Sequence, residues 1–117
     1  MKTQITILED DTDIREICTY IFMEEGYSVN GFCDIASFSA ASTHPDIFLL
    51  DIMLPDGDGR SVCNKLKSDP RYSKIPVVMM SAHKDRNSVM AGCQADDFIE
   101  KPFDIENLLK RIAGLVA

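Results

Sequence analysis

Two short stretches of this sequence are apolar at every position, and they constrain the fold more than any other feature. They are Ile47–Leu50 and Val77–Met80. A strand with one solvated face alternates apolar and polar residues, whereas a strand buried on both faces does not. Burial of both faces is typical of central strands in a parallel sheet that helices cover on each side. We therefore predict strands over Ile47–Ile52 and Pro76–Met80, inside an α/β domain.

The rest of the chain alternates strand-like with helix-like segments. Three more strands are predicted, at Ile5–Leu8, Tyr27–Phe32 and Phe98–Glu100. Five helices are predicted over residues 11–25, from a cap at Asp34 to about Thr43, from the loop Pro55–Gly59 to about Ser68, over Asn87–Cys93, and from a cap at Asp104. Such alternation predicts a parallel sheet between two helical layers, joined by right-handed crossovers.

Composition limits the classes of protein that fit. The 117 residues are 45% hydrophobic and 26% charged, which suits one globular domain spanning 1–117 and leaves no run long enough for a membrane span. A net charge of −7 disfavours direct binding to nucleic acid. The four cysteines show no Cys-x-x-Cys spacing and no signal peptide precedes the first strand, so we expect buried thiols and a cytoplasmic location.

Polar residues follow four of the predicted strands. Glu9–Asp11 follow the first, Asp51 ends the third, Ser81 follows the fourth and Lys101 follows the fifth. In open parallel sheets, ligands bind beyond the carboxyl ends of the strands, where the strand order reverses. These side chains are therefore expected to share one binding edge.

The chemistry of that edge can be predicted from its charges. Three carboxylates, from Glu9, Asp10 and Asp51, would repel one another unless a cation or a proton intervened. Mg²⁺ suits carboxylate, carbonyl and water ligands, especially where a phosphate completes the shell. Lys101 and Ser81 would add an ammonium and a hydroxyl to hold phosphoryl oxygens. Asp51, on the most central strand, is then the candidate nucleophile that forms an aspartyl phosphate.

Taken together, these segments resemble the receiver domain of two-component response regulators over the whole chain. The resemblance is carried by Ile7–Asp11, by Leu49–Pro55 with Asp58–Gly59, by Ile75–Ala82 and by Ala95–Phe103. Each segment alone is weakly specific, but all four in order are strongly specific. The resemblance implies a flavodoxin-like, doubly wound fold with strand order 2-1-3-4-5 and five helices in a three-layer sandwich.

The resemblance also implies a role for each matching residue. Asp51 would accept the phosphoryl group, while Mg²⁺, for which Mn²⁺ is expected to substitute, would be held by Glu9, Asp10, Asp51 and the backbone carbonyl of Met53. Lys101 would pair with a phosphoryl oxygen, and its bond to Pro102 is expected to be cis. Ser81 and Phe98 would be the switch residues, with Phe98 in place of the more usual Tyr.

Two departures from the family pattern fall near the predicted fourth helix. Ser81 and Lys101 stand 20 positions apart, a slightly shorter spacing than the family usually has. Gln94 stands where the family usually has a glycine, so the turn there is expected to be rebuilt. Both departures lie on the face formed by the fourth helix, the fifth strand and the fifth helix, which family members commonly use for dimerisation or output.

The expected function is a phosphorylation-driven switch and not a conventional enzyme. A sensor histidine kinase or a histidine phosphotransfer protein would supply the phosphoryl group. A downstream protein or an output domain outside these residues would read the change, with a phosphorylation-dependent homodimer as one form of that change. The alternative is a degenerate receiver that binds protein without being phosphorylated.

Two other functions on similar architectures fit poorly. A flavin carrier would meet repulsion between its phosphate and Glu9–Asp11. A haloacid-dehalogenase-type phosphatase needs a second Asp two residues after the nucleophile, and Met53 stands there.

Overall fold

The structure is a computed structural model, which describes residues 2–82 and 92–116. Its main sheet contains five strands: β1 (Gln4–Leu8), β2 (Ser28–Phe32), β3 (Ile47–Asp51), β6 (Val77–Ser81) and β7 (Asp97–Glu100). A small hairpin consists of β4 (Met53–Leu54) and β5 (Gly57–Asp58). The described residues form four helices: α1 (Thr12–Glu24), α2 (Ile35–Ala41), α3 (Gly59–Ser68) and α5 (Ile105–Val116).

All neighbouring strands of the main sheet run parallel, in the order β2-β1-β3-β6-β7. Leu8 at the end of β1 pairs with Leu50 of β3, and Asp51 pairs with Met80 of β6. The carboxyl ends of β1, β3 and β6 therefore lie at one edge of the sheet. The order reverses between β1 and β3, which leaves their ends side by side without a crossover above them.

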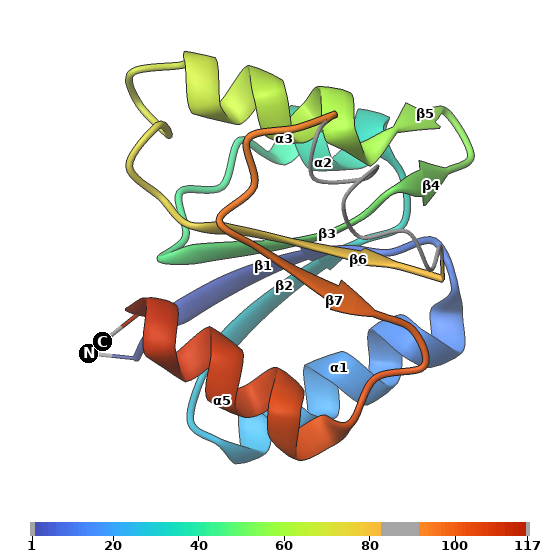
Figure 1. Ribbon diagram of the computed structural model, residues 1–117, viewed down its shortest axis with the longest axis vertical. Coiled ribbons are helices and arrows are strands. Elements are labelled where there is room, and N and C mark those ends of the chain that lie inside the picture. Colours follow the sequence, from blue (N-terminus) through green and yellow to red (C-terminus); the bar gives the residue numbers. More distant parts are fainter. Residues whose placement is uncertain (1, 83–91, 117) are drawn as a thin grey trace.

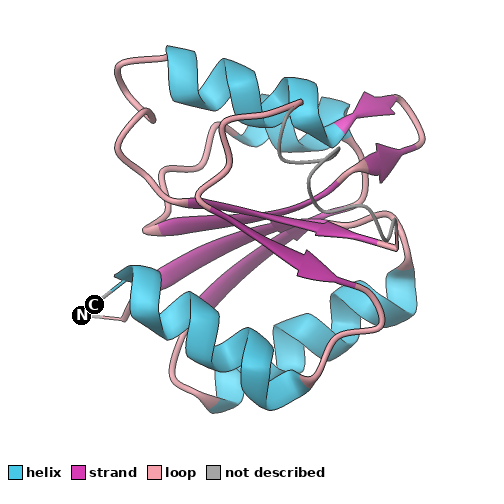
Figure 2. Ribbon diagram, viewed as in Figure 1, coloured by secondary structure: helices cyan, strands magenta, loops and turns pink. Residues whose placement is uncertain are grey.

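The helices form a layer on each side of the sheet (Figure 1). Helices α2 and α3 cover one face and α1 and α5 cover the other, which gives three layers (Figure 2). The core follows the same division. Leu8, Leu50 and Met79 face α2 and α3, whereas Ile7, Leu49 and Met80 face α1 and α5. Neighbouring residues of one strand thus point into different cores, which explains why the central strands are apolar at every position.

The predicted fold class is confirmed, and the strand order corresponds to 2-1-3-4-5 when the hairpin strands are left out. The prediction of five helices differs from the four in the described residues. Most of the predicted helix over Asn87–Cys93 falls on residues 83–91, outside the described ranges, and Gly92 and Cys93 lie in a turn.

Two boundaries were predicted less well. The predicted loop Pro55–Gly59 is wrong in part, because its residues take part in the β4–β5 hairpin and in the first residue of α3. Helix α2 ends at Ala41, before the predicted Thr43, because Ser42 adopts the left-handed conformation with φ of 46°.

Two further findings concern membrane-spanning helices and the cysteines. In the described part of the chain, no helix is long and apolar enough to cross a membrane. The four cysteines, all of which are described, form no disulfide. Cys18 and Cys63 are buried as predicted, whereas Cys33 is exposed.

Candidate functional site

The predicted site residues from the four strand ends gather around one cavity of about 1010 Å³. Glu9 and Asp10 follow β1, Asp51 ends β3, Ser81 ends β6 and Lys101 follows β7. All five side chains line the cavity. The strands bring them together, because neighbouring strands that run parallel have their carboxyl ends at the same edge of the sheet.

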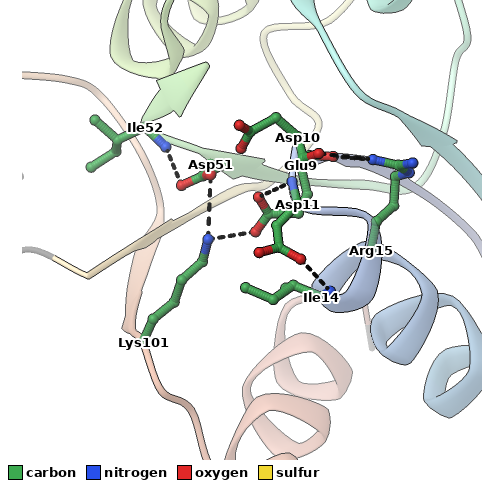
Figure 3. Close-up of polar contacts among 8 residues, drawn as sticks. All are labelled: Glu9, Asp10, Asp11, Ile14, Arg15, Asp51, Ile52 and Lys101. Carbon is green, nitrogen blue, oxygen red and sulfur yellow. Dashed lines mark hydrogen bonds and ion pairs between the residues drawn. The ribbon is translucent and has the colours of Figure 1, made fainter. Parts of the chain in front are cut away.

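Lys101 joins the two buried carboxylates of the site (Figure 3). Its ammonium nitrogen lies 2.5 Å from Glu9 Oε1 and 3.3 Å from Asp51 Oδ2. The other oxygen of Asp51 accepts a hydrogen bond of 2.8 Å from the Ile52 amide. The Glu9 side chain is fully buried, that of Asp51 is 9% exposed and that of Lys101 is 14% exposed. The site thus holds two carboxylates on one cation, largely out of solvent.

Burial shifts the protonation equilibria of this group. The pKa of Glu9 is raised, chiefly by burial and then by its contact with Asp51, although Lys101 opposes the shift. Burial alone would lower the pKa of Lys101, but the contacts with Glu9 and Asp51 outweigh it, so the pKa of Lys101 is raised. The site therefore retains its ammonium firmly, while burial disfavours the ionised form of Glu9.

The donor set fits a hard divalent cation. Glu9, Asp10 and Asp51 each offer a carboxylate oxygen, and these atoms lie within 4.8 Å of one another. Asp10 is exposed, and in the described residues its carboxylate makes no hydrogen bond or ion pair. An all-oxygen set of this kind, open to water on one side, suits Mg²⁺ or Mn²⁺ better than a softer metal.

The loop after Asp51 is held by a close approach of two backbones. A Cβ atom on Gly59 would lie 1.8 Å from the carbonyl oxygen of Asp51, so only glycine fits there. The Gly59 amide also donates a 2.7 Å hydrogen bond to the Ile52 carbonyl. Asp58 caps α3 through the Arg60 amide and forms an ion pair with the Arg60 guanidinium. The start of α3 thus fixes the backbone that presents Asp51.

Met53, Ser81 and Phe98 occupy three different surroundings. Met53 begins the hairpin at the rim of the cavity, and 80% of the residue is exposed. Ser81 is 5% exposed and lines the cavity. Phe98 is 3% exposed and packs into the core beneath α2 and α3, so its ring already points inward. The Lys101–Pro102 peptide bond is cis, which confirms that prediction.

Gln94 itself does not adopt the left-handed conformation. In the described ranges, Ser42 is the only non-glycine residue with positive φ. The Asn64 side chain accepts a hydrogen bond from the Gln94 amide at 3.0 Å and donates one to the Gly92 carbonyl at 3.2 Å. This side chain from α3 thus supports the rebuilt turn.

Sequence reasoning missed two polar residues that support the site. Asp56, at the hairpin turn, accepts hydrogen bonds from the Ile35 and Ala36 amides, and so ties the hairpin to the start of α2. Arg15, on α1, donates to the carbonyl of Glu9 (Figure 3). An Asp in a turn and an Arg on a helix are common, so neither carried a recognisable signal. Asp11, by contrast, caps α1 through the Ile14 amide, as acidic residues often do.

The fold and the acidic cluster together define a class of doubly wound α/β domains with a candidate cation site at the carboxyl ends of the strands, and comparison with known proteins identifies the family. The model of the response regulator receiver domain matches residues 5–113. The chain therefore belongs to the receiver domain family of two-component response regulators.

Relatives and solved structures agree with this assignment. The transcriptional regulatory protein CseB of Streptomyces coelicolor is 37% identical over 121 residues, which cover 98% of this chain and 50% of that protein. The DNA-binding dual master transcriptional regulator RpaA of Synechocystis is 35% identical, over 97% of this chain and 48% of that protein. The chain thus spans about half the length of these relatives.

Solved receiver domains superpose closely on the chain. The receiver domain of a signal transduction histidine kinase from Syntrophus aciditrophicus has a TM-score of 0.88 and 30% identity, and covers 97% of this chain and 89% of its own. The BeF3-activated receiver domain of DrrB, a Thermotoga maritima protein, has a TM-score of 0.90 and 28% identity, over 99% of this chain and 98% of its own.

Proposed function

We propose that the chain is a phosphorylation-driven switch whose acceptor is Asp51 and whose metal ligands are Glu9, Asp10, Asp51 and the backbone carbonyl of Met53. The observation that carries the proposal is the bridge from the Lys101 ammonium to both Glu9 and Asp51 at the end of the sheet. Such a cluster supplies a nucleophilic carboxylate, a fixed cation and a metal-ligand set within one cavity. Family membership supports the same reading.

In the proposed reaction, an Asp51 oxygen attacks the phosphorus atom of a phosphohistidine. The new O–P bond forms as the P–N bond breaks, and the electron pair stays with the imidazole, which takes a proton from solvent. Bound Mg²⁺ would offset negative charge on the phosphoryl oxygens. The Lys101 ammonium, released from Asp51, would pair with one of those oxygens. The Ile52 amide continues to hold the second Asp51 oxygen and keeps the carboxylate aimed into the cavity.

The phosphorylated state is proposed to act through Ser81 and Phe98 on the face that contains β7 and α5. Ser81 lies on the cavity, where its hydroxyl can bond to a phosphoryl oxygen. Phe98 lies one strand away, paired with Met79 of β6 in the register of the sheet. Because its ring is buried already, we expect phosphorylation to stabilise this position rather than to create it.

The partners are likewise part of the proposal. The phosphoryl donor would be a sensor histidine kinase or a histidine phosphotransfer protein in the cytoplasm, a compartment that suits the lack of disulfides. The output would be a partner protein or a domain outside these 117 residues, since relatives named as transcriptional regulators are about twice as long. A homodimer is one form in which the signal could pass. The net charge of −7 disfavours DNA binding by this domain itself.

The test is transfer from a small phosphodonor. The protein is incubated with acetyl phosphate and MgCl₂, and intact mass is measured with and without hydroxylamine, which cleaves acyl phosphates. One phosphoryl group should appear in the wild type and in Asp69→Asn, a control in which the aspartate pairs with Arg71 and lies outside the cavity. It should be absent from Asp51→Asn. No adduct from acetyl phosphate or from a panel of histidine kinases would favour the alternative, a module that binds protein without phosphorylation.

A further inference from the structure

Arg15 contacts the backbone on both sides of Asp10. Its Nη1 donates to the carbonyl oxygen of Glu9 at 2.7 Å and approaches the carbonyl oxygen of Asp10 at 3.4 Å (Figure 3). These two carbonyls belong to the two peptide planes that flank the Asp10 Cα atom. One guanidinium group from α1 therefore restrains both backbone dihedrals of Asp10.

The Asp10 side chain depends on that restraint more than its neighbours do. The Glu9 carboxylate is held by Lys101 and by the Asp11 amide, and the Asp51 carboxylate is held by Lys101 and the Ile52 amide. In the described ranges, no donor holds the Asp10 carboxylate. Its direction follows from its own backbone, which the Arg15 contacts fix.

The path of Arg15 to these carbonyls crosses β2 at a glycine. A Cβ atom on Gly31 would lie 3.3 Å from Cδ and 3.4 Å from Cγ of Arg15, which is tighter than ordinary contact. The Arg15 stem therefore lies directly over the Gly31 backbone. A methyl group at position 31 would require the stem to shift by a few tenths of an ångström, so the size of residue 31 affects how Arg15 reaches the two carbonyls.

We propose that Arg15 is a positioning residue, which orients the Asp10 carboxylate toward the cation site and so raises the affinity of the domain for Mg²⁺. The inference rests on the proposed function, because it concerns the same metal ligands. It assigns Arg15 no contact with the metal or the phosphoryl group.

The sign of the effect distinguishes positioning from simple charge. Arg15 carries a positive charge close to a cation site, so its removal would tighten Mg²⁺ binding if charge alone mattered. Loss of a residue that orients a ligand weakens metal affinity instead, by roughly tenfold or more. Arg15→Gln, which removes the charge and the fork of donors, should therefore lower the affinity about tenfold. Arg15→Lys should recover part of it, through one donor.

The experiment is a titration of ¹⁵N-labelled protein with MgCl₂, followed by backbone amide shifts near Asp10 and Asp51. Arg71→Gln, which removes an exposed arginine from an ion pair with Asp69, is the matched control and should bind Mg²⁺ as the wild type does. Gly31→Ala should weaken binding less than Arg15→Gln, because the guanidinium remains. The same spectra show whether each variant is folded.

The results of the Mg²⁺ titration decide whether Arg15 positions Asp10. Unchanged or tighter binding in folded Arg15→Gln would overturn the inference, while the wild type would still bind Mg²⁺ and accept a phosphoryl group. If Arg15→Gln does not fold, unchanged affinity in both Arg15→Lys and Gly31→Ala would overturn it equally. A wild type that shows no Mg²⁺-dependent shifts would instead overturn the metal part of the proposed function, and the inference with it.

Discussion

Replacement of Asp51 by Asn is expected to stabilise the protein when no divalent cation is present. Asn has nearly the same shape, and its oxygen can still accept the 2.8 Å hydrogen bond from the Ile52 amide. The change therefore mainly removes one negative charge from a site that already holds the carboxylates of Glu9 and Asp10. A loss of charge at a buried, crowded site affects the free energy of unfolding directly.

The magnitude follows from the distances. At an effective dielectric constant near 20, the contact of 3.3 Å between Lys101 and Asp51 is worth about 5 kcal/mol of attraction. Repulsion between Glu9 and Asp51, whose ligand atoms lie within 4.8 Å, is at least about 3.5 kcal/mol. Asp10 lies within the same 4.8 Å but is exposed, and it adds about 1–3.5 kcal/mol. Repulsion, about 4.5–7 kcal/mol in total, thus comes close to the attraction or exceeds it before the cost of burying the carboxylate is counted. We expect a net stabilisation of about 1–2 kcal/mol.

Urea denaturation at neutral pH, with EDTA and then with MgCl₂, measures this difference. Mg²⁺ should stabilise the wild type and have a much smaller effect on Asp51→Asn. Asp58→Asn is the matched control, since Asp58 is paired with Arg60 and its loss of charge should destabilise the protein. Lower stability of Asp51→Asn in EDTA, or equal stabilisation of both proteins by Mg²⁺, would refute the argument from repulsion.

Three further predictions concern other parts of the molecule. Gly59→Ala should destabilise the protein by at least about 3 kcal/mol and abolish phosphorylation, because its Cβ would lie 1.8 Å from the Asp51 carbonyl oxygen; urea denaturation and acetyl phosphate labelling check this. Since burial and the contact with Asp51 raise the pKa of Glu9, the stability that Glu9 contributes in EDTA should be fully present below the ordinary range of Glu and be lost as pH rises through the raised value. Urea denaturation of the wild type and of Glu9→Gln at stepped pH would separate this contribution from those of Asp34, Asp58 and Asp69, whose lowered pKa values act in the opposite direction. Burial raises the pKa of Cys18 to about 12, so a thiol reagent should label exposed Cys33 in the native protein and Cys18 only after unfolding, as peptide mass mapping would show.

The convergence of the main site residues could be predicted from the sequence, for a physical reason. Strands that are apolar at every position must lie inside a covered parallel sheet, and the residues that follow such strands then share an edge. Glu9, Asp51 and Lys101 were placed by this argument, and the structure brings them together. The ion pair between Lys101 and Glu9 was not predicted, because it depends on the direction of the two side chains rather than on the order of the strands.

Other features lay beyond sequence reasoning because long-range contacts determine them. Asp56 accepts hydrogen bonds from two backbone amides at the start of α2, which lie 20 and 21 positions away in the sequence. A local sequence pattern cannot predict contacts over that separation. The hairpin of β4 and β5 consists of strands of two residues each, too short for an alternating pattern. Arg15 turns back from α1 toward the end of β1 and passes close to Gly31 of β2, a contact between distant parts of the sequence.

The same electrostatics favour a chemical role for the cluster over protein binding alone. One ammonium and three carboxylates meet at this edge, a net charge of −2, and Glu9, Asp51 and Lys101 among them are at least four-fifths buried. Buried carboxylates in excess of their cation cost free energy, and a domain that only bound a partner would be more stable with a neutral side chain at position 51. Proteins keep destabilising buried charges of this kind mainly where a site needs a nucleophile or a metal ligand. Because a divalent cation would offset the excess charge and a phosphoryl group would engage Lys101, the arrangement is better explained by a switch that is phosphorylated on Asp51.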